Sequence, residues 1–276
     1  MNKLKTYTEA NRAAWNEAAP KHQAANKAKW DERFSNKGYS IFSSPELEQL
    51  NRIGIQGKSV AHLCCNNGVE LMSLKNLGAE RCVGFDISDL AIAEATSRAE
   101  KSGIDCEFVR SDVFEIDQSY ENQFDLVYIS VGCFGWLPDL AKFLSIAASL
   151  LRADGRLFIY EMHPFCDMLS CDSDNEANPL SIIDPYFKET PHVETDGIDY
   201  VGKTTYQSLS KYWFVWTISD IVMGITNSGF TLEFFKEYPI DISASHQRNE
   251  SAGVSMPLSY IITARRTSEQ GSGGNG

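Results

Sequence analysis

Short apolar runs recur along the middle of the chain, and a helical pattern separates each run from the next. The runs cover residues 60–63, 81–85, 106–109, 124–129 and 156–160. Each has the length of a strand, and a continuous apolar run is typical of a strand that is buried on both faces of a parallel sheet. Strands that alternate with helices predict an α/β fold with helices on both faces of the sheet.

Capping residues mark where the helices begin and end. Ser88 is a good N-cap, and Gly78 and Gly103 stand where a glycine ends a helix. Thr217 and Asp220 have the spacing of a capping box. Together these signals predict helices over residues 69–76, 89–101, 138–151 and 217–227.

Two further apolar strands are predicted after the last of these helices, over residues 230–238 and 259–265. A loop long enough for an antiparallel hairpin joins them. We therefore expect one domain over residues 51–266, with a seven-stranded, mostly parallel sheet that is flanked by helices and whose last strand is antiparallel.

The residues before this domain predict a helical cap over 1–50. Residues 8–33 form a polar, alanine-rich helical pattern that Pro20 is expected to interrupt. A loop over 38–44 follows, and Pro45 starts a second helix that runs to about residue 51.

An insertion after the fifth strand is expected over residues 165–216. Its first part, 166–178, is acidic and predicts a mobile loop, whereas 198–206 and 211–216 alternate as two added strands do. Residues 267–276 are rich in serine and glycine and predict a disordered tail.

The most informative stretch is 59–88, which predicts strand, tight turn, helix and strand, and ends near Asp86. A carboxylate at the tip of the second strand of such a unit is placed to bind a ribose. Two ligands fit this unit, a nicotinamide dinucleotide and S-adenosylmethionine. A dinucleotide pyrophosphate needs several glycines in the turn, and only Gly68 is present, which favours S-adenosylmethionine.

These residues resemble the first motif of the class I (Rossmann-like) S-adenosylmethionine-dependent methyltransferases. That motif has an acidic residue followed by three glycines at alternate positions. Here the four positions are occupied by His62, Cys64, Asn66 and Gly68, so three of them depart from the pattern. Asparagine tolerates left-handed backbone angles, so Asn66 and its neighbour Asn67 are expected to turn the chain.

The resemblance implies a set of cofactor contacts at successive strand ends. Asp86 would bind the ribose and Asp112 the adenine amino group, with Val113 supplying a backbone N–H to the ring. Glu70 is a candidate for the carboxylate that His62 does not supply. The full set of cofactor-binding residues expected for S-adenosylmethionine is Cys64, Asn66, Gly68, Asp86, Ile87, Asp112, Val113 and Ser130.

Aromatic side chains are expected to border the methyl acceptor. Phe134 and Trp136 follow the fourth strand, where the resemblance places the sulfonium, and an aromatic face is a favourable partner for such a cation. Trp15, His22 and Trp30 lie in the N-terminal helix and would form a lid. The aromatic insertion favours a flat or apolar organic acceptor.

Glu161 and His163 follow the fifth strand and are the candidates for general acid or base. Residues two apart in an extended segment point to the same side. Histidine titrates near neutral pH without any perturbation. A base is required only when the acceptor is protonated at the working pH.

Composition narrows the class of partners. A net charge of −12 argues against a general nucleic-acid binder, which needs a basic surface, and against an acidic membrane surface. Seven cysteines without a C-x-x-C pair are typical of reduced thiols in a cytoplasmic protein. The five histidines show no ligand spacing, so no metal site is expected.

The sequence thus predicts a cytoplasmic enzyme, a monomer or homodimer, that methylates a small organic acceptor. A peptide, protein or tRNA acceptor stays open. Two other classes of function also stay open. One is a nicotinamide-dependent oxidoreductase, which would bind NAD. The other is a non-catalytic binding module with this fold.

Overall fold

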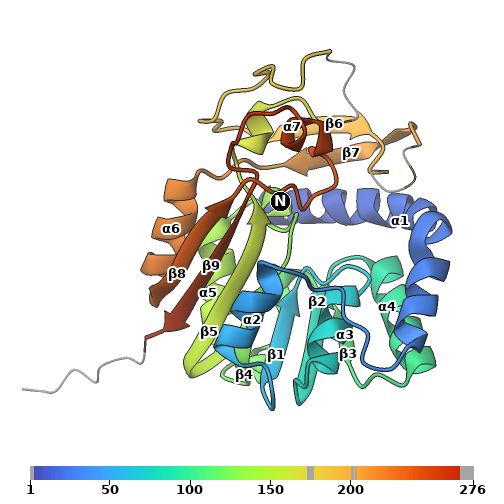
Figure 1. Cartoon of the computed structure of the whole chain (residues 1–276), viewed down its shortest axis with the longest axis vertical. Coiled ribbons are helices and arrows are strands. Elements are labelled where there is room, and N and C mark those ends of the chain that lie inside the picture. The colour runs from blue at the N-terminus through green and yellow to red at the C-terminus, as the bar shows by residue number, and fades with distance from the viewer. Residues whose placement is uncertain (1–2, 173–176, 200–201, 203, 268–276) are drawn as a thin grey trace, which may run out of the picture.

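A seven-stranded sheet crosses the centre of the protein in the computed structural model, which describes residues 3–172, 177–199, 202 and 204–267 (Figure 1). Its strands are β1 (Ser59–Leu63), β2 (Arg81–Asp86), β3 (Glu107–Arg110), β4 (Phe124–Ile129), β5 (Leu151–Met162), β8 (Phe230–Tyr238) and β9 (Ser259–Arg266). Their order is β3-β2-β1-β4-β5-β9-β8. The fifth strand is longer than expected, because the chain becomes extended at Leu151 immediately after the preceding helix.

Only β9 runs against the other strands. β1 pairs in parallel with β2 and with β4, and β4 pairs in parallel with β5. β9 pairs antiparallel with both β5 and β8. The predicted seven-stranded sheet with a reversed last strand is therefore confirmed.

Helices cover both faces of the sheet (Figure 1). Val60 of β1 packs in one apolar cluster with Leu50 of α2 (Glu46–Ile53) and Leu71 of α3 (Val69–Asn76). Ala61, the next residue, packs in the opposite cluster with Phe143 of α5 (Leu140–Leu150). This alternation is what a strand between two helical layers requires. The helices of the domain are α2 (Glu46–Ile53), α3 (Val69–Asn76), α4 (Asp89–Ser102), α5 (Leu140–Leu150), α6 (Ile218–Asn227) and α7 (Gln247–Glu250).

The predicted caps are present. The Ser88 hydroxyl accepts a hydrogen bond from the backbone N–H of Ala91, and Gly103 ends α4 with φ of 64°. Thr217 and Asp220 form the predicted capping box at the start of α6. These local signals fix the helix boundaries before any tertiary contact contributes.

The N-terminal segment is one helix, α1 (Lys3–Ser35), and the predicted interruption at Pro20 is wrong. The helix continues through the proline, and Figure 1 shows that α1 changes direction along its length. A proline inside a helix removes one backbone hydrogen bond and bends the axis, and packing on both sides holds the two halves here. α1 packs along β7 and α4. Among the described residues no helix, α1 included, is both long and apolar enough to cross a membrane.

The insertion forms a two-stranded antiparallel sheet of β6 (His192–Asp196) and β7 (Gln207–Trp213). The predicted strand over 198–206 is therefore wrong, because the first strand lies earlier, and 200, 201 and 203 lie outside the described residues. The loop predicted over 166–178 is also only partly correct. It begins with a buried 3₁₀ turn at Cys166–Met168, and residues 173–176 lie outside the described residues.

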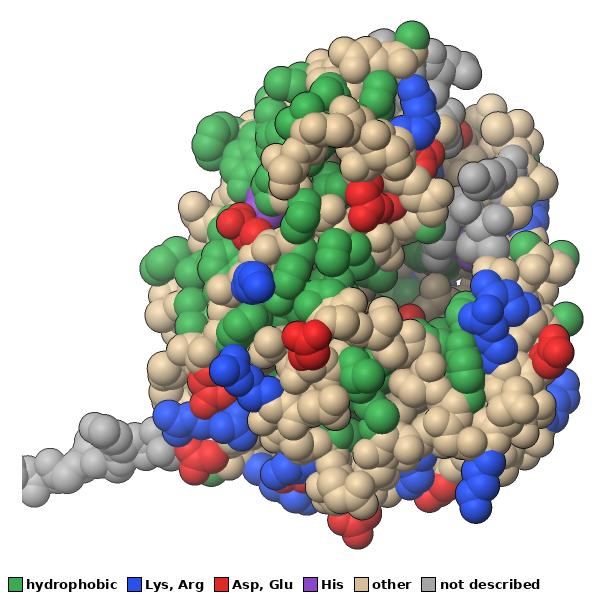
Figure 2. All heavy atoms as spheres, in the orientation of Figure 1, with side chains coloured by type: hydrophobic (Ala, Val, Ile, Leu, Met, Phe, Trp, Pro, Cys, Tyr) green, Lys and Arg blue, Asp and Glu red, His purple; other side chains and the backbone are tan. Residues whose placement is uncertain are grey.

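The insertion and the first half of α1 lie above the carboxyl ends of the parallel strands (Figure 1). In open α/β sheets ligands bind at these strand ends. Figure 2 shows that the surface is hollowed there, between the insertion and the strand ends.

Candidate functional site

The turn after β1 has the backbone geometry of a glycine-rich turn although it contains one glycine. The φ angles of Cys64, Asn66 and Gly68 are 56°, 47° and 76°. These are the three positions at which the methyltransferase motif carries glycine. A β-carbon on Gly68 would approach Cε1 of Phe108 to 2.5 Å, so this glycine cannot be replaced without a shift of its neighbours. The expected left-handed conformation of Asn66 is confirmed, and Cys64 shares it.

Asp86 fastens this turn to the end of β2. One carboxylate oxygen accepts the backbone N–H of Asn66 at 2.8 Å and the other accepts that of Ser88 at 2.8 Å. Burial raises the pKa of Asp86. The backbone N–H groups of Ser88, Asn66 and Ile87 stabilise the ionised carboxylate and oppose this rise.

His62 does not replace the carboxylate of the motif. Its side chain is fully buried, its Nε2 lies 3.0 Å from the Ser130 hydroxyl, and its ring packs edge-on against Tyr128. Burial lowers the pKa of His62 to about 3, so the ring is neutral at physiological pH. Its Nδ1 has no hydrogen-bond partner among the described residues. Glu70 is half-buried at the start of α3, and burial raises its pKa to about 7.

Asp112 and Val113 follow β3, as the strand pattern predicts, and both are buried. The Asp112 carboxylate accepts the backbone N–H of Phe114 at 3.0 Å and so caps the 3₁₀ turn Val113–Glu115. This cap fixes the direction of Asp112 at the same edge of the sheet as Asp86.

Glu161 holds the loop that follows β4. Its buried carboxylate accepts backbone N–H groups from Gly132, from Cys133 at 2.8 Å and from Phe134 at 3.2 Å, as well as from its neighbour Met162. Burial raises the pKa of Glu161 to about 7, although these hydrogen bonds oppose the rise. A carboxylate with four backbone donors is a positioning group for the loop, and its predicted role as a general base gains no support from this geometry.

His163 forms hydrogen bonds with Glu237 of β8 and with Phe165, neither of which belongs to the loop that Glu161 binds. Its Nδ1 accepts the backbone N–H of Phe165 at 3.0 Å, so Nε2 carries the proton and donates to Glu237 of β8 at 3.0 Å. Burial lowers the pKa of His163, against the effect of Glu237. The two candidates for general acid or base, Glu161 and His163, bind different partners, because Glu161 accepts N–H groups of the loop after β4 and His163 donates to Glu237.

The structure brings together most of the predicted aromatic residues. The Trp15 ring lies 5.3 Å from that of Trp136 and 5.8 Å from that of His22. Trp213 of β7, one of the aromatic residues of the insertion, lies 5.1 Å from Trp136. Trp30 is not part of this group, because α1 has bent away by then and Trp30 packs near Phe34 and α3.

Side chains of α1 form hydrogen bonds both with the insertion and with the start of α4, next to the end of β2. The Asn11 side chain exchanges two hydrogen bonds with the backbone of Tyr212 in β7, at 3.0 and 2.8 Å. Arg12 and Asn16 bind Asp89, and Asn16 also accepts from Ser88. The predicted lid therefore joins the aromatic insertion to the strand end that carries Asp86. The Nε2 of His22 contacts the carbonyl oxygen of Ile198 and so ties the bend of α1 to the insertion.

The sequence did not identify Arg98, a buried residue of α4, as part of this region. Its guanidinium donates to the carbonyl oxygen of Asn67, in the turn after β1, at 2.7 Å. It also donates to Glu94 and, at 3.1 Å, to Asp31 of α1. The side chain has no exposed surface. Arg98 thereby links the turn to the second half of α1.

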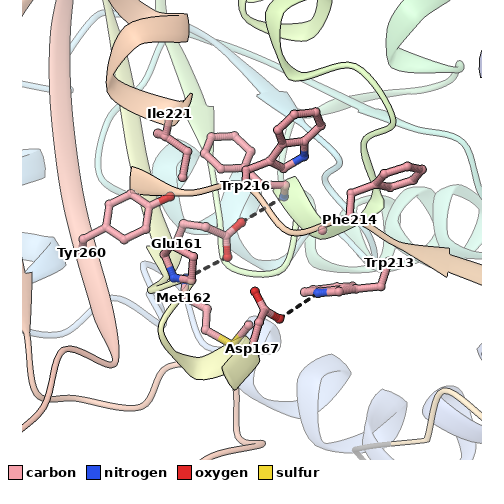
Figure 3. A pocket seen from close by; sticks show the side chains of 11 residues that line it. Glu161, Met162, Asp167, Trp213, Phe214, Trp216, Ile221 and Tyr260 are labelled. Carbon is pink, nitrogen blue, oxygen red and sulfur yellow. Dashed lines mark hydrogen bonds between the residues drawn. The ribbon is translucent and has the colours of Figure 1, made fainter. Parts of the chain in front are cut away.

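A small pocket lies behind the loop that Glu161 holds (Figure 3). Its volume is about 20 Å³, room for about one water-sized group. Asp167 lies in its wall and accepts the indole N–H of Trp213 at 2.8 Å. Burial raises the pKa of Asp167 to about 7, and the charge of Glu161 adds to the rise.

The comparisons with known proteins agree with this geometry. Residues 60–155 match the family described as "Methyltransferase domain". This matched stretch includes the turn after β1, Asp86 and Asp112, and over it the chain is similar to methyltransferases. Its similarity to methyltransferases makes S-adenosylmethionine the cofactor.

Solved methyltransferases share the fold. An S-adenosylmethionine-dependent methyltransferase from Mesorhizobium loti aligns with a TM-score of 0.59 and 21% identity, over 80% of this chain and 97% of that one. The 1,6-didemethyltoxoflavin-N1-methyltransferase of Burkholderia thailandensis, with bound 1,6-didemethyltoxoflavin and S-adenosylhomocysteine, aligns with a TM-score of 0.57 and 14% identity. That alignment covers 97% of this chain and 92% of the Burkholderia chain.

Curated relatives match over a shorter stretch. The ribosomal protein L11 methyltransferase of Escherichia coli is 29% identical over 117 residues, which is 40% of this chain. The match spans 38% of the length of that relative.

Proposed function

We propose that this protein transfers a methyl group from S-adenosylmethionine to a small organic acceptor. The observation that carries the proposal is the turn at Cys64, Asn66 and Gly68, whose three left-handed residues stand where the family has glycines. Asp86 holds that turn through its carboxylate, which is the group proposed to bind the ribose of the cofactor. The bound cofactor supplies a methyl group that its sulfonium already activates.

The chain's own residues position the reactants and exclude water. Holding two reactants in line supplies up to roughly 7–11 kcal/mol of the barrier. A base is required only when the acceptor is protonated at the working pH. Glu161 fixes the loop Gly132–Phe134, which the family resemblance places beside the sulfonium. Trp15 and Trp136 cover this region from α1 and from the loop.

A small acceptor is favoured over a macromolecule by the closed geometry above the strand ends. α1 and the insertion are fastened to each other through Asn11 and Tyr212, and they bring three tryptophans to the same place. The Burkholderia structure, which has a similar fold over nearly the whole chain, contains a small organic acceptor. A protein acceptor is the second candidate, because the curated relatives methylate a ribosomal protein.

One labelling experiment separates these candidates. The purified chain is incubated with methyl-labelled S-adenosylmethionine and a cell extract that has been divided by ultrafiltration into small molecules and macromolecules. We expect label in the small-molecule fraction and none with the Gly68→Ala variant, whose β-carbon meets Phe108. Label in protein or RNA would refute the small acceptor, and transfer to neither fraction would favour a non-catalytic module.

A further inference from the structure

The pocket behind the loop Gly132–Phe134 has an acidic lining. Its described lining residues include the carboxylates of Glu161 and Asp167 and no lysine, arginine or histidine. The charges that act most strongly on Asp167 are those of Glu161, Glu194 and Asp184, all of them negative. Buried carboxylates are normally paired with a cation.

Glu194 and Asp184 have lysine partners, whereas no ion pair among the described residues includes Asp167 or Glu161. Lys211 binds Glu194 at 2.9 Å and Asp196 at 3.0 Å, and Lys188 binds Asp184 at 2.8 Å. Asp167 itself receives a hydrogen bond from the neutral indole of Trp213 alone among the described side chains. Figure 3 shows its other oxygen directed toward Glu161 across the pocket.

Tyr260 of β9 gives a second, independent sign of a missing ligand. The residue is fully buried, and its hydroxyl has no hydrogen-bond partner among the described residues. Figure 3 shows this hydroxyl directed into the same pocket. An unpaired buried hydroxyl is costly, so a polar group is expected to meet it.

The walls suit a cation. Trp213, Phe214 and Trp216 line the pocket together with Phe134. Aromatic faces attract cations, and the attraction increases when water is excluded. The volume of about 20 Å³ admits a group the size of an ammonium ion but not a ring.

We propose that this pocket binds the terminal ammonium group of an amine-bearing methyl acceptor, between the carboxylate of Asp167 and the hydroxyl of Tyr260. The inference rests on the proposed function and adds the chemical class of the acceptor to it. The rest of the acceptor extends out of the pocket toward Trp136 and Trp15.

The test uses three probes that share a phenylethyl group and differ in their terminal group: 2-phenylethylamine, 2-phenylethanol and the larger, anionic 3-phenylpropionate. Binding to the full chain saturated with S-adenosylhomocysteine is followed by tryptophan fluorescence and by calorimetry. We expect the amine to bind at least about tenfold more tightly than the alcohol, as one charge-assisted hydrogen bond supplies, and the carboxylate not to bind.

Two variants test whether the preference for the amine over the alcohol arises in the pocket. Asp167→Asn is expected to remove the difference between amine and alcohol, and Tyr260→Phe to reduce it, since the ring and its packing remain. Asp196→Asn is the matched control, because its side chain lies on the same insertion but is 80% exposed. Thermal unfolding of each variant identifies any that fails to fold.

Equal binding of amine and alcohol, binding of none of the probes, or a preference that survives in Asp167→Asn would overturn the inference and identify the pocket as a water site only. If the protein does not bind S-adenosylhomocysteine, the proposed function fails by itself. The amine preference is then measured on the cofactor-free chain and decides the inference separately.

Discussion

Arg98 offers the sharpest test of how the glycine-poor turn is held. Its guanidinium binds Asn67 in the turn, Glu94 on its own helix and Asp31 on α1. Replacement by methionine keeps the apolar stem but leaves Glu94, which is 7% exposed, without a counter-ion. Asp31 keeps a counter-ion, because Lys27 still binds it at 2.6 Å.

Loss of one partner of a buried ion pair costs about 3–5 kcal/mol, so we expect Arg98→Met to lower the free energy of unfolding by this amount. Most of the loss comes from the uncompensated carboxylate of Glu94. The double variant Arg98→Met with Glu94→Leu removes that carboxylate and is expected to recover most of the stability.

Cofactor affinity should not recover in the same way. In both variants the carbonyl oxygen of Asn67 has lost its donor, and one hydrogen bond of about 0.5–1.5 kcal/mol corresponds to a roughly two- to tenfold loss of affinity. Urea unfolding measures the stability, and calorimetry with S-adenosylhomocysteine measures the affinity.

The control is Arg152→Met, because Arg152 is 52% exposed and pairs with Asp125 at 3.3 Å. An exposed pair of this kind contributes at most about 1 kcal/mol. The reasoning is refuted if Arg98→Met costs no more than Arg152→Met, or if the double variant is no more stable than the single one.

Three further predictions follow from the same structure. Cys64→Gly should raise the free energy of unfolding by about 1 kcal/mol in urea titrations, because φ of 56° is unfavourable for cysteine; unchanged or lower stability would contradict this. Burial raises the pKa of Glu46 to about 8 from its ordinary 4.5, so the folded chain holds a proton that the unfolded chain releases. The free energy of unfolding should therefore fall as pH rises from 4.5 to about 8. The fall should be smaller in Glu46→Gln, and an equal dependence on pH in the two proteins would refute this. His163→Ala should leave the affinity for S-adenosylhomocysteine unchanged and lower stability, since its ring binds Phe165 and Glu237; a selective loss of turnover would restore its predicted catalytic role.

The sheet and the cofactor end were predictable because their signals are local. Apolar runs marked the strands, and Asp86 and Asp112 follow two of them directly. Ser88 and Gly103 fixed α4 through caps that need no tertiary contact. Parallel strands then bring their carboxyl ends to one edge, so position in the chain was enough to place both acids.

What the sequence did not predict depends on distant partners. Glu161 was identified as a candidate acid or base, and the sequence did not reveal that the loop 132–134 supplies its hydrogen bonds. Asp167 stands in an acidic stretch and becomes a wall of a pocket only because Trp213 reaches it. β6 was missed because it is a half-exposed strand with few apolar residues, and its Val193 is 62% exposed.

The central claim is that the turn at Cys64, Asn66 and Gly68 is a working S-adenosylmethionine site. The most direct test is a calorimetric titration of the purified chain with S-adenosylhomocysteine and, separately, with NAD. The account predicts micromolar binding of S-adenosylhomocysteine, a strong loss of that affinity in Asp86→Ala, and no binding of NAD. Binding of NAD, or no binding of either ligand, would contradict it.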